Sequence, residues 1–301
     1  MLSVNIPVYN IEVNDLIHQI ARQCAHLHID FEIRIYDDGS QEEIKAKNRS
    51  LAKLSQVVYK EMPVNYGRSA IRNRMGSDSE KDYLLFIDAD SKVTSERYVE
   101  TYLRHATPGC VLCGGTSYPA EPPADGKKLL RWVYGCKREA ITAEERNKNK
   151  GFILTSNNFL IDRKVFQQTC FREDIGPYGH EDTLLGYDLY KKGVHPLHIN
   201  NPVEHTGLED SMVFIVKTGK ALENLLVISD KLLKGKSDFS GKIKFLNRYR
   251  KLTRFCPPFV IRLFFNLFKQ HMEQNLTGRK PLLMLYDLYK VGYFASLKKG
   301  K

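Results

Sequence analysis

The stretch from Tyr83 to Asp90 constrains the fold of this chain most strongly. Apolar residues run without a break from Tyr83 to Ile87, and such a run indicates a strand that is covered on both faces of a sheet. Two carboxylates, Asp88 and Asp90, follow the run directly. They are expected at the edge of the sheet where ligands bind, although aspartate is also frequent in ordinary turns.

The strands expected before this one also end in polar residues. Residues 3–8 lead towards Asn10, and residues 31–36 lead into Asp37 and Asp38. Segments with helical spacing separate the expected strands, and this alternation predicts a doubly wound α/β sheet. Because the carboxyl ends of such strands meet at one edge, the three sets of polar residues favour a ligand site over isolated turns.

The composition is typical of a globular protein. Of the 301 residues, 27% are charged and 42% are hydrophobic, which agrees with average values. The six cysteines show no disulfide framework, and Cys110 and Cys113 lie in an apolar run that predicts a strand. We recognise no signal peptide and no apolar stretch of membrane-spanning length, and we therefore expect a reducing, cytoplasmic location.

Positive charge is concentrated in the C-terminal part. From residue 211 on, the chain has 19 of its 46 Lys and Arg residues but 5 of its 35 Asp and Glu residues, a balance of +14 against −3 for the remainder. We therefore expect an α/β domain over residues 1–210 and a basic helical extension over residues 211–301. A basic surface can meet nucleic acid, anionic lipid or an acidic substrate, but no nucleic-acid-binding motif accompanies this charge.

An aromatic-rich helix is expected inside the extension. Pro257 and Pro258 can start it, and it carries Phe259, Phe264 and Phe268 with Arg and Lys residues beside them. The segment is too short and too charged to cross a bilayer. It could lie in the interface of an anionic inner membrane face as a peripheral anchor, or it could pack on the rest of the chain.

The motifs, taken in order, resemble those of the family-2 inverting glycosyltransferases with the GT-A fold. The matching pieces are Ile6-Pro7-Val8-Tyr9-Asn10, Asp37-Asp38-Gly39-Ser40, Asn65-x-Gly67, Ile71-Arg72-Asn73, Asp88-Ala89-Asp90 and Gly179-His180-Glu181-Asp182. They extend over roughly the first two thirds of the chain. Residues 179–193 are most similar to the chondroitin-polymerase and galactosyltransferase-like branch.

The resemblance implies a mixed sheet flanked by helices, with a C-terminal helical extension. It also implies an enzyme of polysaccharide biosynthesis. Such an enzyme transfers a hexose or an N-acetylhexosamine with inversion, from a nucleotide-diphosphate sugar, most often a UDP-sugar, to a saccharide or lipid-linked acceptor. The donor contacts that it implies are Pro7, Tyr9, Asp37, Asp38, Asn65, Gly67, Arg72, Asp88, Asn157 and Asn158.

The residues themselves leave alternatives for several of these contacts. An aspartate can accept a hydrogen bond from uracil N3–H, but either Asp37 or Asp38 could instead cap the helix expected from residue 42. Arg72 could hold a diphosphate or a base, or form only a surface ion pair. Asn157 and Asn158 could line the sugar site or bind backbone groups.

The resemblance also implies a divalent metal, Mn²⁺ or Mg²⁺, ligated by Asp90. Asp88 would then contact the ribose or a metal-bound water, and hard oxygen ligands at this spacing suit either ion. The family often adds a histidine from beyond the Glu-Asp motif. His205 fits that position, and His195 and His198 compete with it.

The second residue of the Glu-Asp pair, Asp182, is by this resemblance the general base that takes the proton of the acceptor hydroxyl. Glu181 would bind acceptor or donor hydroxyls. The dipole of the following helix would stabilise both as anions, although acidic residues belong in the first turn of any helix.

Three other functions share some of these features. A haloacid-dehalogenase-type phosphatase also has an apolar strand that ends in Asp-x-Asp, but this motif usually lies close to the N-terminus. A sugar nucleotidyltransferase would need a glycine-rich, lysine-containing N-terminal loop, which this sequence lacks. A catalytically inactive, basic module at a membrane surface would keep the fold and lose the transfer reaction.

Overall fold

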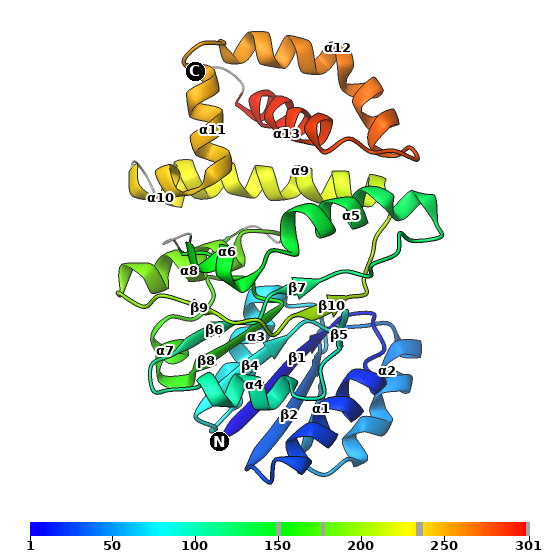
Figure 1. The fold of residues 1–301 in the computed structure, drawn as a ribbon, viewed down its shortest axis with the longest axis vertical. Coiled ribbons are helices and arrows are strands. Elements are labelled where there is room, and N and C mark those ends of the chain that lie inside the picture. The colour runs from blue at the N-terminus through cyan, green and yellow to red at the C-terminus, as the bar shows by residue number, and fades with distance from the viewer. Residues whose placement is uncertain (149–151, 176–177, 233–236, 299–301) are drawn as a thin grey trace. The chain divides into compact units, whose positions relative to one another are not determined.

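The computed structural model describes residues 1–148, 152–175, 178–232 and 237–298 (Figure 1). The chain divides into two compact units. Unit 1 comprises residues 1–119, 139–177 and 181–207, and unit 2 comprises residues 120–138, 178–180 and 208–301. Unit 2 is therefore assembled from segments that are not continuous in the sequence.

The described part of unit 1 is built on a seven-stranded mixed sheet, which confirms the predicted α/β class. The strands, in their order across the sheet, are β3 (Val57–Glu61), β2 (Phe31–Asp37), β1 (Leu2–Val8), β4 (Tyr83–Ile87), β8 (Asn158–Asp162), β6 (Val111–Cys113) and β9 (Leu197–His198). The first four are parallel, and β8 runs antiparallel to both of its neighbours.

The sheet reverses its strand order at β1. The chain continues from β1 through β2 to β3 on one side, and β4 then pairs on the other side. Pairing between β1 and β4 ends at Asn5, whereas pairing between β1 and β2 continues to Val8 opposite Asp37. A reversal of this kind, at the carboxyl ends of parallel strands, is where open α/β sheets bind their ligands.

The segments that follow β4, β6 and β9 in the sequence form a second, three-stranded sheet. It consists of β5 (Ser91–Val93), β10 (Val203–His205) and β7 (Thr116–Ser117), in that order. β5 and β10 are antiparallel, with His205 opposite Ser91. This pairing brings a segment from beyond residue 200 next to the Asp-x-Asp motif.

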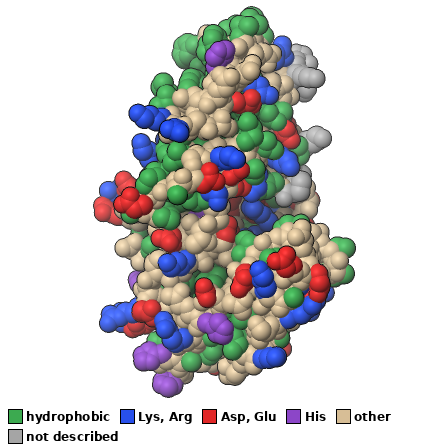
Figure 2. All heavy atoms as spheres, turned by 90° about the vertical axis from the view of Figure 1, so that its right-hand side faces the viewer, with side chains coloured by type: hydrophobic (Ala, Val, Ile, Leu, Met, Phe, Trp, Pro, Cys, Tyr) green, Lys and Arg blue, Asp and Glu red, His purple; other side chains and the backbone are tan. Residues whose placement is uncertain are grey.

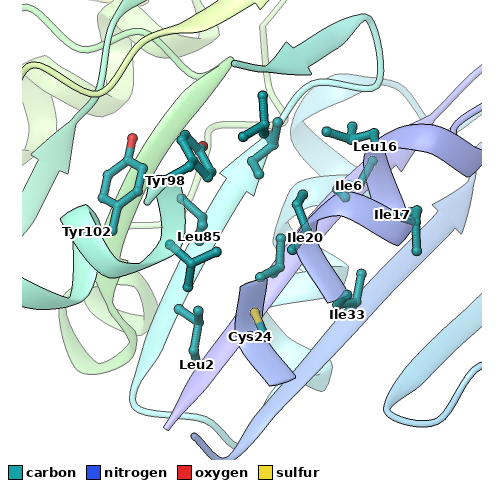
Figure 3. Packing of buried hydrophobic residues seen from close by; sticks show 14 of the residues in the cluster. Leu2, Ile6, Leu16, Ile17, Ile20, Cys24, Ile33, Leu85, Tyr98 and Tyr102 are labelled. Carbon is teal, nitrogen blue, oxygen red and sulfur yellow. The ribbon is translucent and has the colours of Figure 1, made fainter. Parts of the chain in front are cut away.

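Helices cover both faces of the large sheet. They are α1 (Asn14–His26), α2 (Glu42–Asn48), α3 (Arg68–Asp78), α4 (Tyr98–His105), α6 (Ala143–Lys148), α7 (Arg163–Gln168) and α8 (Glu181–Lys191). In Figure 3, Ile17 and Ile20 of α1 pack with Ile6, Ile33 and Leu85 of the strands. The neighbour of Leu85, Phe86, belongs to the other core cluster, with Phe159, Phe166 and Phe171. The unbroken apolar run of β4 thus reflects burial on both faces, as predicted.

The described part of unit 2 is helical. Its α-helices are α5 (Leu129–Tyr134), α9 (Ser211–Val227), α10 (Ser237–Lys242), α11 (Lys244–Thr253), α12 (Pro258–Leu276) and α13 (Leu283–Leu297). Phe265 of α12 packs with Tyr289 of α13 and Ile215 of α9. α12 begins at Pro258, as expected. Over the described residues, no helix has both the length and the hydrophobicity that crossing a bilayer requires.

One buried polar network fixes the centre of unit 1. The side chain of Asn158 is fully buried, and its amide nitrogen donates to the carbonyls of Gly115 (2.8 Å) and Asn201 (2.9 Å). Its amide oxygen accepts from the hydroxyls of Tyr98 (2.6 Å) and Tyr102 (2.7 Å). All four of its hydrogen-bonding positions are therefore used within the protein.

We expect Asn158→Ala to lower the free energy of unfolding by roughly 3 kcal/mol or more, because each buried partner left unpaired costs about 1–3 kcal/mol. Chemical denaturation measures this difference. Asn157→Ala is the matched control, since the half-buried Asn157 side chain donates to Thr116 Oγ1 (2.8 Å). A loss no larger for Asn158 than for Asn157 would contradict the role given to the network.

Candidate functional site

The loops that follow β1 and β2 are tied to each other. Asn10, in the left-handed region at φ 56°, donates its N–H to Ser40 Oγ (2.7 Å), and its side-chain oxygen accepts from Gln41 N–H (2.8 Å). Asp37 Oδ1 accepts from Ser40 N–H (2.7 Å). α2 begins after Gln41 without a side-chain cap, so neither Asp37 nor Asp38 caps it.

Asp38 fixes the next loop. Its two carboxylate oxygens accept the N–H groups of Tyr66 (2.8 Å) and Gly67 (3.0 Å). Burial raises the pKa of Asp38, and these two hydrogen bonds oppose that effect. The turn at Gly39, with φ +81°, passes so close to this loop that a Cβ there would lie 2.8 Å from Asn65 N. Asn65 and Gly67 are thereby brought to the end of β2, and their part in donor binding stays a prediction.

Asp37 differs from Asp38 in its hydrogen bonding. Its side chain is buried, and Oδ2 has no hydrogen-bond partner among the described residues. The half-buried Pro7 and the 52% exposed Tyr9 lie where β1 ends, since Val8 is opposite Asp37 in the sheet. The end of β2 thus contains one carboxylate oxygen that no described residue satisfies.

Arg72 is a buried cation that interacts with the carboxyl groups of two motifs. It is only 3% exposed, and its Nη2 donates to Asp88 Oδ1 at 2.5 Å. Its Nη1 donates to the carbonyl of Arg68 (3.2 Å), and its guanidinium lies 5.6 Å from the ring centre of Phe171. Burial raises the pKa of Asp88, Arg72 opposes this rise, and the charge of Asp90 adds to it. Because Arg72 is buried, its ion pair with Asp88 is not the surface ion pair that the sequence left as an alternative.

Asp90 and His205 lie side by side, with 3.6 Å between Asp90 Oδ2 and His205 Nδ1. The register of β5 and β10 places them there, and Thr206 N–H donates to the carbonyl of Asp90 (2.8 Å). Gly207 packs against the same carboxylate. A Cβ at residue 207 would lie 2.4 Å from Asp90 Oδ2 and 2.9 Å from its Cβ.

The other two candidate histidines are engaged elsewhere. His198 is buried, and its Nδ1 accepts from Arg146 Nη1 (2.9 Å). Burial and the charge of Arg146 lower the pKa of His198 to about 4. His195 packs edge-on against Tyr190, with ring centres 5.8 Å apart. His205 is therefore the one of the three that the structure brings to the Asp-x-Asp motif.

The chemistry of this pair fits a divalent cation. The carboxylate oxygen of Asp90 and the imidazole nitrogen of His205 are ligands that Mn²⁺ accepts. No group of three or more His, Cys, Asp or Glu side chains within the described residues is placed to hold a metal. Two protein donors leave further coordination positions for phosphate oxygens and water, the usual arrangement for a metal that binds together with a nucleotide.

Glu181 and Asp182 begin α8 and have unlike environments. Glu181 is buried and lies 3.4 Å from Arg68 Nη1. Burial alone would raise the pKa of Glu181, but the charges of Arg68 and Arg72 outweigh it and hold the pKa below its usual range. Burial, and then the charge of Glu181, raises the pKa of Asp182 to about 7. At neutral pH the first is a carboxylate and the second is poised to exchange a proton.

A cavity of about 310 Å³ opens beside Glu181. It is lined by residues 65–70, Arg172, Glu173, Ile175 and Glu181. Its wall therefore includes both the loop held by Asp38 and the carboxylate held by Arg68.

The sequence places this arrangement in a known family. Residues 3–170, more than half of the chain, match the glycosyl transferase family 2. The chain belongs to glycosyl transferase family 2. It is therefore a glycosyltransferase, and the structure gives it the fold that the resemblance implied. The branch suggested by residues 179–193 stays a hypothesis.

Several solved structures share this fold at low sequence identity. The mannosyltransferase PcManGT from Pyrobaculum calidifontis, in complex with GDP-Man and Mn²⁺, has a TM-score of 0.59 and 12% identity, over 99% of this chain and 88% of its own. S. aureus TarS 1-349 in complex with UDP-GlcNAc has a TM-score of 0.50 and 14% identity, over 99% and 90%. No match was found among curated proteins.

The two asparagines predicted for the donor site of this glycosyltransferase separate in the structure. The carbonyl of Asn157 accepts Asp88 N–H (3.0 Å), so this residue lies at the Asp-x-Asp motif. Asn158 is enclosed in the network of Tyr98 and Tyr102 and has no exposed side chain. The prediction that Asn158 contacts the donor is therefore wrong, because its side chain is fully buried and all of its hydrogen-bonding positions are used within the protein.

Sequence reasoning did not identify two residues that shape the site. Arg68 pairs with Glu181, and Gly207 packs on Asp90. A signal for Arg68 was present, because it lies four residues before Arg72 and so on the same face of a helix. No comparable signal marked Gly207, since its contact with Asp90 depends on the pairing of β5 with β10.

We expect Asp182→Asn to remove a pH dependence of stability. An Asp with a raised pKa stabilises the folded state fully below its unfolded pKa of about 3.9, and this contribution is lost as the pH rises through about 7. The wild type should therefore lose on the order of 2 kcal/mol more than the variant between pH 5 and pH 8. Denaturation at both pH values measures this. Asp82→Asn, on an exposed carboxylate, is the control, and parallel curves for wild type and Asp182→Asn would contradict the assigned environment.

Proposed function

We propose that this chain transfers a sugar with inversion from a nucleotide-diphosphate sugar to the hydroxyl of a saccharide or lipid-linked acceptor. One observation carries the proposal. The charge of Arg72 acts on Asp88, Glu181 and Asp182, which come from motifs almost a hundred residues apart. Asp88, at a strand end suited to a nucleotide, and Asp182, a carboxyl suited to proton transfer, therefore both lie within the influence of the Arg72 charge.

The nucleoside would bind at the ends of β1 and β2. Asp37 keeps one carboxylate oxygen without a partner among the described residues, and uracil N3–H is a donor of the kind that it requires. Both carboxylate oxygens of Asp38 accept hydrogen bonds from backbone N–H groups. Asp38 would therefore act by holding the loop that contains Asn65 and Gly67. On this basis we propose a UDP-sugar as the donor, like the UDP-GlcNAc in the TarS complex and unlike the GDP-Man in the PcManGT complex.

Asp90 and His205 would hold a divalent cation beside the diphosphate. Such an ion, when bound, neutralises the phosphate charge and stabilises the departing nucleotide. Arg72 holds Asp88 in place, and Asp88 would then be oriented towards the ribose or a metal-bound water. Mn²⁺ is the ion we propose, because the pair includes a nitrogen ligand.

Asp182 would act as the general base. Inversion in one step requires a group that removes the proton of the acceptor hydroxyl as its oxygen attacks the anomeric carbon. A base is most effective when its pKa is close to the working pH, and of the adjacent carboxyls Asp182 is the one whose pKa is raised to about 7. Glu181, held ionised by Arg68 and Arg72, would instead accept hydrogen bonds from sugar hydroxyls along the wall of the cavity.

We expect UDP-sugars with Mn²⁺ to raise the melting temperature of the wild type, since a ligand that binds only the folded state stabilises it. Asp90→Asn should weaken Mn²⁺ binding and abolish transfer. Gly207→Ala should do the same less severely, because the added methyl group displaces the Asp90 side chain. Thermal shifts with UDP, GDP and Mn²⁺, together with transfer assays, measure these effects.

The controls for this metal experiment are Asp82→Asn and Gly126→Ala. Asp82 is exposed, and a methyl group at Gly126 meets its nearest neighbour at an ordinary 4.0 Å. A preference for GDP would overturn the proposal that the donor carries uracil. Unchanged Mn²⁺-dependent turnover in Asp90→Asn would overturn the metal assignment. Release of phosphate from phosphorylated substrates, without transfer, would favour the phosphatase alternative.

The pH dependence of transfer tests the base. Below about pH 7 Asp182 is protonated and cannot accept a proton, so kcat/KM should fall about tenfold per pH unit towards acid and level off above pH 7. Asp182→Asn should lose about 10²–10⁴-fold in kcat, keep UDP-sugar binding and lose the acid limb. If Glu181→Gln loses activity in this way while Asp182→Asn stays active, the two roles are reversed.

A further inference from the structure

α12 carries a broad apolar face that the described residues leave exposed. Its exposed large side chains are Phe259, Val260, Leu263, Phe264, Leu267 and Phe268. With 3.6 residues per turn, these positions occupy roughly half of the helix circumference over almost three turns. Ile261, Phe265 and Met272 occupy the opposite side and are buried, Phe265 against α13. In Figure 2, hydrophobic side chains gather at the end of unit 2 that Figure 1 labels α12.

The exposure of these residues is large. Leu267 is 65% exposed, and Phe255, in the connection from α11 to α12, is 90% exposed. Phe264 and Phe268 are 48% and 44% exposed, and their rings pack on each other with centres 4.6 Å apart. Leaving this many rings and aliphatic chains in water is unfavourable, and a patch of this kind marks an interaction surface.

The charge around this face is predominantly positive. Residues 244–280 contain nine Lys and Arg residues and a single acidic residue, Glu273. On α11 and at its end, Lys244, Arg248, Lys251 and Arg254 are all exposed. α11 has no acidic residue to neutralise them. The apolar face therefore adjoins, along the chain, a helix with a strong positive charge.

We propose that α12 docks this unit on an anionic lipid bilayer, with its exposed apolar face among the acyl chains and the cations of α11 at the headgroups. A helix that combines exposed aromatic residues with flanking cations binds in the plane of the interface. The partner must accept rings over about three turns and supply negative charge. A second copy of the same face would instead bring like charges together, and charge complementarity therefore favours the bilayer.

Two features separate this docking from membrane insertion. None of the described helices can span a bilayer, so the attachment must lie in the interface. Each basic residue near an anionic surface contributes a salt-sensitive attraction of electrostatic origin. Docking should therefore weaken as the salt concentration rises, which insertion of a spanning helix would not.

The test is co-sedimentation of the full chain with phosphatidylcholine vesicles that contain or lack phosphatidylglycerol. We expect binding to the anionic vesicles alone, weakened by salt. Leu263→Ser/Leu267→Ser should reduce the partition coefficient at least tenfold, and Arg248→Gln/Lys251→Gln should reduce it about fivefold per residue. All four positions are exposed, so these variants should fold, and circular dichroism with thermal denaturation verifies this.

Matched controls use the same changes elsewhere. Met212→Ser/Val216→Ser alters exposed apolar residues of α9, and Lys53→Gln/Lys164→Gln removes two exposed charges of unit 1. Both should bind anionic vesicles like the wild type. Equal sedimentation with both vesicle types, no sedimentation with either, or a dimer in solution that Leu263→Ser/Leu267→Ser disrupts would overturn the proposal. Binding of UDP by these variants tests the donor site separately, so the two proposals can fail independently.

Discussion

The ion pair between Arg72 and Asp88 is the interaction on which the charged centre of this glycosyltransferase depends. Arg72 is almost fully buried, and a buried charge without a partner costs several kcal/mol. Asp88 supplies that partner at 2.5 Å, and Phe171 covers the guanidinium. The same cation opposes the pKa rise of Asp88 and lowers the pKa of Glu181. One buried arginine therefore acts on carboxylates from two separate motifs, at Glu181 together with Arg68.

The divergence of Glu181 and Asp182 follows from this placement. The two residues are adjacent on one helix start and have the same functional group. Arg68 and Arg72 lie close enough to Glu181 to keep it charged, and that charge, together with burial, then raises the pKa of Asp182. Two carboxyls with separated pKa values are the arrangement that lets one bind and the other exchange a proton.

Much of the fold and part of the site could be predicted because they depend on local patterns. The apolar run of β4, the alternation of strands and helices and the start of α12 at Pro258 follow from periodicity and from proline geometry. Asp38 binds the N–H groups of Tyr66 and Gly67, which brings the second and third motifs together, while their role in donor binding stays a prediction. Asn158 was misplaced, because the residue type gives no sign of which face of β8 it occupies or that Tyr98 and Tyr102 would enclose it.

The sequence by itself determined the α/β class, the family and the position of the carboxylates at strand ends, since these follow from short-range periodicity and ordered motifs. Only the tertiary structure decided that His205 rather than His198 lies beside Asp90, through the register of β5 with β10. It also decided the partners of Arg72 and the environment of Asp182. The physical reason is the same in each case: burial and the distance between charges depend on contacts between segments that are remote in the chain.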